Sequence, residues 1–411
     1  MKLVRSGRDL RVDFFRGIAL FCIFLDHIPH DELARFTVRN LALNDATEIF
    51  ILLAGYAAAL VYGRKLDRAG PVSATGDMLK RTWTIYIAHI FLFSIFIAEV
   101  AVCAAIFSHP NYVAEIGLDH LAKEPLVAIA QAVPMLYQPV FLNVLPLYVV
   151  IMGGVAPFLV LIRWPKAMLA ASFALYVAAR VFGWNLPTWN GHTWFFNPFT
   201  WQFLLVLGML FSRYGKPDLP GVATDIVAVA LLVVGFAILM TTWLMPSLAV
   251  HVPAVIRPFI RDIDKTGLHP YRLLSILALA WLSARYIPPT AKFLSSRAAS
   301  VFILIGQHGL NTYCASILLS FAGRVALEQD PGWGMQVAVN LAGLCAMLLV
   351  AAIGAWHKVK DAKPVVSPAA RPSAGPDPGP AVPAGGRGDG MPAGAGADAG
   401  ASPSQGSPES R

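Results

Sequence analysis

Long apolar runs alternate with short polar segments along most of the chain. A helix needs about 20 mostly apolar residues to cross the hydrocarbon core of a bilayer. Ten runs approach or exceed this length, and we predict them to be spans: 13–30, 44–62, 82–107, 142–162, 167–183, 198–214, 221–244, 269–287, 300–323 and 334–356. The pattern therefore predicts an all-α, polytopic membrane protein with about ten transmembrane helices.

Basic residues are concentrated in every second segment between the predicted spans. These segments carry Arg64, Lys65, Arg68, Lys80, Arg81, Arg163, Lys166, Arg213, Lys216, Arg285, Lys292, Arg297, Lys358, Lys360 and Lys363. The intervening segments are longer and also carry acidic residues, such as Glu115 and Asp119. Because Lys and Arg hold a loop on the cytoplasmic side, we predict an even number of spans with both termini in the cytoplasm.

The segments on the outer side differ from simple connectors. Three of them, 108–141, 184–197 and 245–268, are rich in Pro, Trp, Asn and His, which is typical of a binding surface. From about Pro364 the chain consists mainly of Pro, Gly, Ala and Ser, and such a composition cannot form a packed core. We therefore predict a membrane domain over 1–360 and a disordered cytoplasmic tail over 361–411.

The composition agrees with a lipid environment for most of the chain. Of its 411 residues, 56% are hydrophobic and 14% are charged, whereas soluble domains have roughly 25% charged residues. The net charge of +8 does not indicate nucleic-acid binding, because the basic residues lie in short clusters between apolar runs. The four cysteines all lie in apolar runs without the spacing of metal ligands, so we expect no metal site and no disulfide framework.

The first span carries ionisable residues, which are costly inside a membrane and usually functional. Arg16 and His27 are eleven residues apart, so a helix places them on one face, roughly 16 Å apart along its axis. Asp13 can pair with Arg16 one turn away. Arg16 is either an anchor at the cytoplasmic interface or a functional group. For His27, preceded by Asp26, we favour function over packing, because histidine exchanges protons near neutral pH.

The second and third spans also carry polar residues. Asp45 and Glu48, at the start of the second span, either form a capping box or orient a histidine. Lys80 and Arg81 lie at the inner end of the third span, where basic residues are expected as anchors in any case. His89 lies roughly 12 Å deeper in the same span.

The sixth and ninth spans add amides and a histidine. Asn197, Trp201 and Gln202 follow an aromatic stretch that is typical of a membrane interface, and the two amides exceed what such a belt requires. In the ninth span, Gln307 and Asn311 are four residues apart on one face, close to His308, and such residues either join helices by hydrogen bonds or contribute to a site.

These residues resemble the OpgC family, which succinylates osmoregulated periplasmic glucans, within the wider membrane acyltransferase superfamily. Members of the superfamily carry an arginine, ten residues and then a histidine, as Arg16 and His27 do. The similar stretches, over about residues 8–325, are Arg11-Val-Asp13-Phe-Phe-Arg16-Gly17, Asp26-His27-Ile-Pro29, Asp45-Ala-Thr-Glu48-Ile-Phe50, Ala54-Gly55, Arg81 with Tyr86 and His89, Leu145-Pro146-Leu147-Tyr148, and Asn197-Pro198 with Trp201-Gln202. The chain departs from the superfamily in the late span, where a Ser-Tyr motif is common and this sequence reads Gln307-His308-Gly309-Leu310.

The resemblance implies an acyltransferase of the bacterial inner membrane. Its donor would be acyl-CoA, with succinyl-CoA favoured, used as a co-substrate at the cytoplasmic face near Arg16, Lys80 and Arg81, and no cofactor would be bound tightly. The acceptor would be a hydroxyl of a periplasmic glucan or other polysaccharide. The predicted site residues are the catalytic candidates His27, Glu48 and His89, the acceptor-side candidates Asn197, Trp201, Gln202, His308 and Asn311, and the structural residues Asp13 and Asp26. The resemblance implies that His27 is either the general base or a transient acyl carrier.

The sequence leaves other functions open. Buried Arg, His and Glu residues also suit a secondary transporter or a flippase for a glycan or an anionic small molecule. Against this hypothesis, the spans show no repeated halves of the kind that such folds usually carry. A polyprenyl-dependent glycosyltransferase would need acidic metal ligands, for which Asp262 and Asp264 are weak candidates. The acyl group, the acceptor and the oligomeric state are not decided by the sequence.

Overall fold

The computed structural model describes residues 9–107, 111–241, 247 and 263–361. Contacts divide the chain into two units, Met1–Asp361 and Ala362–Arg411. The predicted disordered tail and most of the outer segment 245–268 lie outside the described residues. All of the described helices belong to the first unit.

The described residues form helices and no strands, apart from an isolated bridge between Pro187 and Thr193. Within the described part of the chain, six helical stretches are long and apolar enough to cross a membrane: Ala46–Ile106, Val144–Arg163, Pro165–Phe182, Gly221–Leu239, Gly309–Gln329 and Trp333–Lys360. Three more helices have 17 residues each, namely α1 (Leu10–Asp26), α9 (Pro198–Tyr214) and α12 (Pro270–Tyr286). The predicted all-α membrane class is confirmed, and the number of ten spans stays a prediction.

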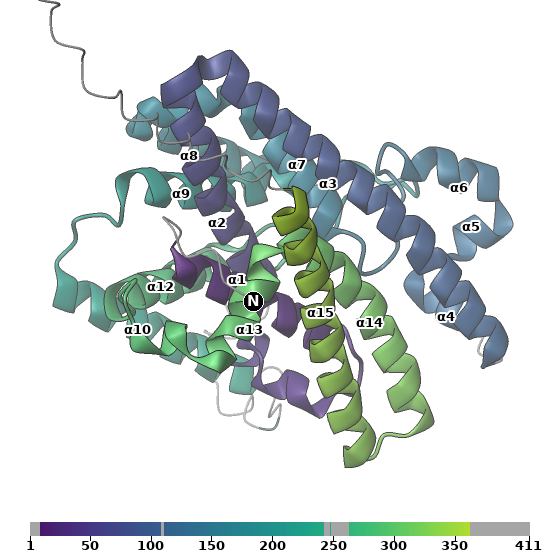
Figure 1. Ribbon diagram of the computed structural model, residues 1–411. Coiled ribbons are helices and arrows are strands. Elements are labelled where there is room, and N and C mark those ends of the chain that lie inside the picture. The colour runs from purple at the N-terminus through teal and green to yellow at the C-terminus, as the bar shows by residue number, and fades with distance from the viewer. Residues whose placement is uncertain (1–8, 108–110, 242–246, 248–262, 362–411) are drawn as a thin grey trace, which may run out of the picture. The chain divides into compact units, whose positions relative to one another are not determined.

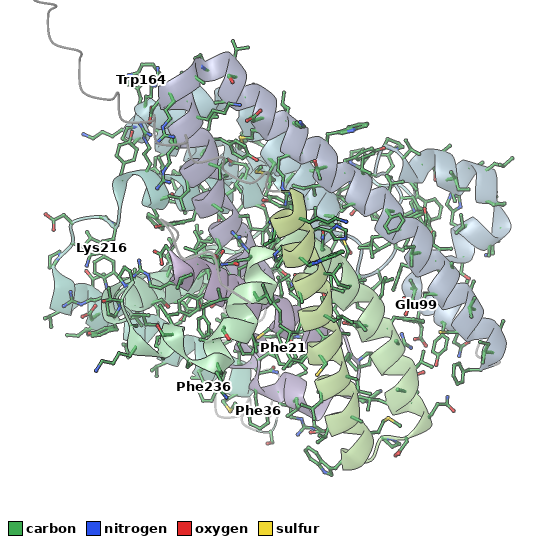
Figure 2. The ribbon with its side chains drawn as sticks, viewed as in Figure 1. Phe21, Phe36, Glu99, Trp164, Lys216 and Phe236 are labelled. Atoms are coloured by element: carbon green, nitrogen blue, oxygen red, sulfur yellow. The ribbon has the colours of Figure 1, made fainter. Side chains whose placement is uncertain are left out.

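Large apolar side chains cover much of the outer surface. Figure 2 shows Phe36, Trp164 and Phe236 at the periphery, where they are 75%, 58% and 40% exposed. Soluble proteins rarely expose apolar surface on this scale. Phe21 instead contacts the ring of Phe302 on α13 (Arg297–Gln307), with the ring centroids 6.0 Å apart. The outward-facing apolar side chains are therefore suited to contact lipid.

The second and third predicted spans form one helical hairpin (Figure 1). Helix α2 (Ala46–Ala58) passes through a π-helical turn (Ala59–Gly63) into α3 (Arg64–Ile106), so the segment 63–80, predicted as a loop, is largely helical. The chain reverses at Gly70, whose φ of +79° suits glycine, and Pro71 follows in a position where its fixed φ is tolerated. An ion pair between Lys65 and Asp77 joins the two arms.

Two pairs of helices pack with almost no space between their backbones. A Cβ atom built on Gly306 of α13 would lie 1.8 Å from the carbonyl oxygen of Asp13 on α1, and one built on Gly17 would lie 1.9 Å from that of Phe302. The same arrangement joins α2 to α9, where a Cβ atom built on Gly208 would lie 2.1 Å from the carbonyl oxygen of Leu52. Small residues allow such close packing in membranes, and they place α1 and α2 inside the bundle.

We expect Gly306→Ala to destabilise the protein by about 1–3 kcal/mol, because the new methyl group has to push α1 and α13 apart. Denaturant unfolding in detergent measures the effect. Gly154→Ala, on α7 (Val144–Val155), is the control, because nothing lies within 4 Å of its Cβ position. Equal effects of the two substitutions would contradict the close-packing explanation.

The ninth predicted span, 300–323, consists of two helices instead of one. Helix α13 ends at Gln307 and α14 (Gly309–Gln329) begins after His308. Helix α13 is antiparallel to α1, since Phe302 lies beside Gly17 and the later residue Gly306 lies beside the earlier residue Asp13. Helix α14 runs parallel to α1, since the Ser320 hydroxyl donates to the Phe24 carbonyl oxygen at 2.9 Å and Gly323 faces Ile28. The chain therefore reverses its direction at His308.

The remaining helices surround this core. They are α4 (Asn111–Ile116), α5 (Asp119–Lys123) and α6 (Pro125–Ala132), α7 with a 3-10 extension (Ala156–Arg163), α8 (Pro165–Phe182), α10 (Gly221–Leu239) and α15 (Trp333–Asp361). Short 3-10 turns at Glu32–Phe36 and Val38–Asn40 follow α1, and another at Lys292–Ser295 precedes α13. Figure 1 shows α14 and α15 side by side, and α4 to α6 form a small helical group at one end of α3.

Candidate active site

A cluster of four charged residues lies where α2 begins. Glu48 is fully buried, and its Oε1 atom accepts from Arg272 Nε at 2.7 Å. Asp45, one turn before Glu48, forms an ion pair with Lys265. We call Asp45, Glu48, Lys265 and Arg272 the charged cluster. Its two acidic and two basic residues balance, as buried charges require.

The start of α2 explains the position of the acidic pair. Asp45 Oδ1 accepts from the backbone N–H of Thr47 at 2.8 Å, and Glu48 Oε2 accepts from the backbone N–H of Asp45 at 3.1 Å. These two bonds form a capping box, one of the two interpretations that the sequence left open for Glu48. Both Glu48 oxygens are therefore bonded within the charged cluster. The described residues show no hydrogen bond between Glu48 and His27, the other interpretation of Glu48.

His27 lies beside the charged cluster at the C-terminal end of α1, where it is the C-cap residue. Its Nδ1 atom is 2.6 Å from the carbonyl oxygen of Ile23, and its ring packs edge-on against Phe141 at 4.9 Å. Asp45 and Lys265 both act on the imidazole electrostatically. A carbonyl oxygen can only accept, so the hydrogen bond assigns the proton to Nδ1. In the neutral ring the lone pair is then on Nε2, the arrangement that a general base requires.

Asp26 connects the end of α1 to the next segment. Its Oδ1 atom accepts from the hydroxyl of Thr37 at 2.6 Å. Asp31 binds in turn to α15, because its Oδ1 accepts from Asn340 Nδ2 at 3.1 Å. The residue next to His27 therefore anchors the segment that covers this end of the bundle.

Arg16, in the N-terminal half of α1, and Arg81 both lie near Tyr148. Arg16 donates from Nη2 to the carbonyl oxygen of Leu53 at 2.9 Å, and both guanidinium groups act electrostatically on the Tyr148 hydroxyl. Lys80 and Arg81 are exposed on α3. Asp13, which is buried, accepts from Gln307 Nε2 at 3.2 Å. The three predicted donor residues are thus placed toward one end of the bundle, and His27 toward the other.

Aromatic side chains connect these two ends. The ring of Phe50, two residues after Glu48, lies 5.9 Å from that of Tyr148 and 6.1 Å from that of Tyr313. Tyr313 is fully buried and its hydroxyl has no hydrogen-bond partner among the described residues. His89 is 1% exposed, and its Nδ1 atom also has no partner there. A buried polar group without a partner is unusual, and such groups are often found where a ligand or water binds.

The three acceptor-side candidates on α9 have structural contacts. Asn197 caps the helix through the N–H of Phe199 at 3.0 Å, and Gln202 joins α9 to α8 through the hydroxyl of Ser172 at 2.6 Å. Trp201 is fully buried and donates from Nε1 to the carbonyl oxygen of Thr266 at 3.1 Å. The backbone N–H of Asn197 also donates to the Thr266 carbonyl oxygen, at 3.0 Å. Since Thr266 follows Lys265 of the charged cluster, Asn197 and Trp201 help to hold that segment in place.

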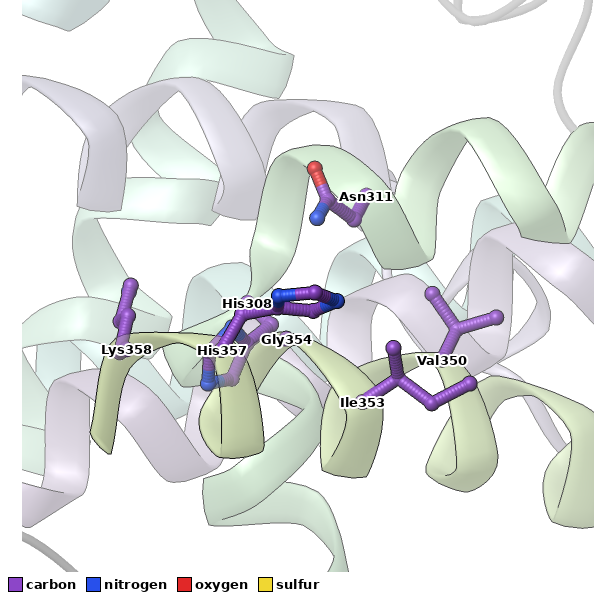
Figure 3. Close-up of a pocket in the computed structure, with 7 residues that line it drawn as sticks. All are labelled: His308, Asn311, Val350, Ile353, Gly354, His357 and Lys358. Carbon is purple, nitrogen blue, oxygen red and sulfur yellow. The ribbon is translucent and has the colours of Figure 1, made fainter. Parts of the chain in front are cut away.

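His308 and Asn311 lie elsewhere, at the end of α1 that carries Arg16. Gly309 faces the side chain of Arg16, with a Cβ position 3.1 Å from Arg16 Cδ. Figure 3 shows His308 and Asn311 lining a cavity with the last turns of α15. The structure therefore separates these two acceptor-side candidates from the three on α9.

Arg272 and Lys265 were missed as site residues in the sequence. Arg272 lies inside the predicted span 269–287, and an ionisable residue within a span was the signal that could have identified it. Its partner Glu48 is 224 positions away, so no local pattern connects the two.

One of three comparisons with known proteins gave a match, and that match covers all of the site residues described above. A family described as OpgC protein matches residues 8–359, from just before α1 almost to the end of α15. Curated proteins and solved structures gave no match. The match includes the charged cluster, His27 and the arginines near Tyr148. The chain belongs to the OpgC family.

Proposed function

We propose that this protein transfers an acyl group from cytosolic acyl-CoA to a hydroxyl of a periplasmic glucan. Family membership points to a glucan-modifying, acyltransferase-like role. Succinyl is the acyl group that the resemblance favours, so succinyl-CoA would be the donor. The single observation that carries the proposal is the environment of His27, because its fixed Nδ1–H leaves Nε2 free to take the proton of an attacking hydroxyl.

The direction of transfer follows from the basic segments. Arg213 pairs with Asp67, and Arg163 donates to the carbonyl oxygen of Leu66 at 3.2 Å, so three basic segments meet at one end of the bundle. We assign this end to the cytoplasm of a bacterial inner membrane. Arg16 and Arg81 then lie toward the cytosol, where acyl-CoA is made, and His27 lies toward the periplasm.

The roles of the remaining residues follow from their contacts. The charged cluster would hold the segment around His27 rigid, and the aromatic residues between Tyr148 and Tyr313 would line the path of the acyl chain. The sugar oxygen bonds to the acyl carbon of the thioester as its proton passes to His27, and the C–S bond breaks. The proton released from His27 restores the neutral imidazole and balances protonation of the CoA thiolate, so that CoA leaves as the thiol. His27 acting directly as a base makes a covalent acyl-histidine step unnecessary.

The test is transfer by the purified protein in detergent, with succinyl-CoA and a linear or cyclic glucan. We expect release of CoA thiol that depends on glucan, and glucan whose mass increases by the acyl group. A transporter or flippase would leave both substrates unchanged. Comparing periplasmic glycans from cells with and without the gene, by mass spectrometry, identifies the natural acceptor.

We expect Arg16→Ala and Arg81→Ala to weaken acyl-CoA binding about tenfold each, the size expected when a charged hydrogen bond is lost. Lysine at either position should restore only part of the affinity, because it lacks the planar fork that grips a phosphate. Calorimetric titration with CoA measures the change. Arg68→Ala, an exposed arginine of the α2–α3 hairpin, is the control, and unchanged affinity in both test variants would move the donor site elsewhere.

Sidedness is testable by cysteine labelling with an impermeant maleimide in a background without the four native cysteines. Val72 and Leu126 are suitable positions, since they are 86% and 83% exposed. We expect Leu126→Cys to react from the periplasm and Val72→Cys to react only after the cytoplasm is made accessible. The reverse result would exclude the proposed direction of transfer.

A further inference from the structure

A cavity of about 520 Å³ lies between the first turn of α14 and the last turns of α15. Figure 3 shows His308 and Asn311 on one side, and Val350, Ile353, Gly354, His357 and Lys358 on the other. Its volume is within the usual range of small-molecule sites. The function proposed above assigns no part of the reaction to it.

The lining of the cavity favours an anion that carries an apolar part. Lys358 is positively charged, the two imidazoles and the Asn311 amide provide N–H donors, and none of the seven lining residues is acidic. Val350 and Ile353, eight and five residues before Lys358 on the same helix, add apolar side chains to the lining. Phosphate groups are bound in proteins by this combination of a lysine charge and N–H donors.

The cavity depends on a glycine and on the reversal at His308. A Cβ built on Gly354 would lie 2.6 Å from His308 Nδ1 and 3.2 Å from Cε1, so the imidazole occupies the space that a side chain would fill. His308 is only 9% exposed and is the residue at which the chain turns from α13 into α14. The turn therefore brings its ring against the backbone of α15.

The cavity lies close to the proposed donor residues. Gly309, next to His308, faces the side chain of Arg16, whose Cγ and Cδ atoms are 3.9 and 3.1 Å from its Cβ position. Arg16 of α1 and the cavity therefore both lie beside the first turn of α14. Lys358 belongs to a basic segment of the end assigned to the cytoplasm.

We infer that this cavity is a phosphate-binding site that receives the nucleotide end of acyl-CoA, with Lys358, His357 and His308 as its donors. The assignment of the ligand rests on the proposed function. Anionic phospholipid headgroups carry the same phosphate chemistry, and they are the alternative source of the ligand at this end of the bundle.

The experiment measures CoA binding to the purified full-length protein in an uncharged detergent without added lipid. We expect Lys358→Ala to weaken CoA binding about tenfold, as for one charged hydrogen bond. Lys360→Ala, two residues further along α15 with its ammonium group over Trp356, is the matched control and should change affinity less than about twofold. Gly354→Ala should also weaken binding, whereas Gly334→Ala on the same helix, with nothing near its Cβ position, should not.

A second arm places the same variants in nanodiscs of phosphatidylcholine with and without phosphatidylglycerol. If Lys358→Ala removes only a phosphatidylglycerol-dependent rise in Tm and leaves CoA affinity unchanged, the nucleotide assignment is overturned in favour of a lipid headgroup. If it changes neither, the phosphate site itself is overturned. CoA binding does not require transfer, so a protein that binds CoA through Lys358 and transfers nothing would refute the proposed function while the site stands.

Discussion

Replacing His27 with alanine is expected to lower kcat about 10²- to 10⁴-fold, the usual contribution of a general base. His27 donates from Nδ1 to the carbonyl oxygen of Ile23 and lies at the C-terminal end of α1 beside the charged cluster, so its Nε2 atom can accept a proton. The acyl-CoA affinity should change little, because Arg16 lies toward the other end of the helix. Glucan-dependent release of CoA thiol measures kcat, and calorimetric titration measures the affinity.

His27→Asn separates the chemistry from the packing. The Asn side chain still has an amide N–H that can donate to the carbonyl oxygen of Ile23, but it has no basic nitrogen. We therefore expect it to fold as the native protein does and to be as inactive as His27→Ala. Substantial activity of the asparagine variant would show that His27 is only a helix-capping residue.

Glu48→Gln is expected to destabilise the protein by about 3–5 kcal/mol, the usual effect of removing one partner from a buried ion pair. The side chain keeps its size, but the Arg272 guanidinium, which is 12% exposed, loses its main counter-charge. Denaturant unfolding in detergent measures the loss. Glu32→Gln is the matched control, because its ion pair with Arg35 is largely exposed and worth about 0–1 kcal/mol.

A second substitution tests whether the pair itself is responsible. Combining Glu48→Gln with Arg272→Met removes both charges, so the double variant should be more stable than Glu48→Gln alone. The single variant Arg272→Met is measured as well. If the stability lost by the double variant equals the sum of the losses of Glu48→Gln and Arg272→Met, Glu48 stabilises the protein through the cap of α2 instead of through Arg272.

The sequence predicted what depends on local patterns. Run length and composition were enough for the all-α membrane class. Arg16 lies in a helix that is continuous from Leu10 to Asp26, and His27 is the C-cap of that helix, as the interval between them suggested. The Asp45–Glu48 spacing contained the capping box, since both of its bonds are formed within four residues. These features need no information about distant parts of the chain.

Features that depend on distant contacts could not be predicted. The partner of Glu48 is on α12, and the residues that hold Lys265 in place are on α9. The sequence pattern does not indicate the reversal at His308, because apolar residues continue on both sides of it and hydropathy does not distinguish a turn from a straight helix. The separation of His308 and Asn311 from Asn197, Trp201 and Gln202 follows from that reversal.

The close pairing of α1 with α13 also sets an order for biosynthesis. The Asp13–Gln307 contact spans 294 positions, and at about 5–20 residues per second the ribosome takes roughly 15–60 s to make that length of chain. During this interval α1, with its buried carboxylate and arginine, is in the membrane before its tightest partner exists. At 11 residues, or roughly 16 Å, α13 is too short to span the bilayer by itself. The first helix to be made is therefore among the last to reach its final packing, and a protein truncated before residue 297 should be recognised by quality-control proteases.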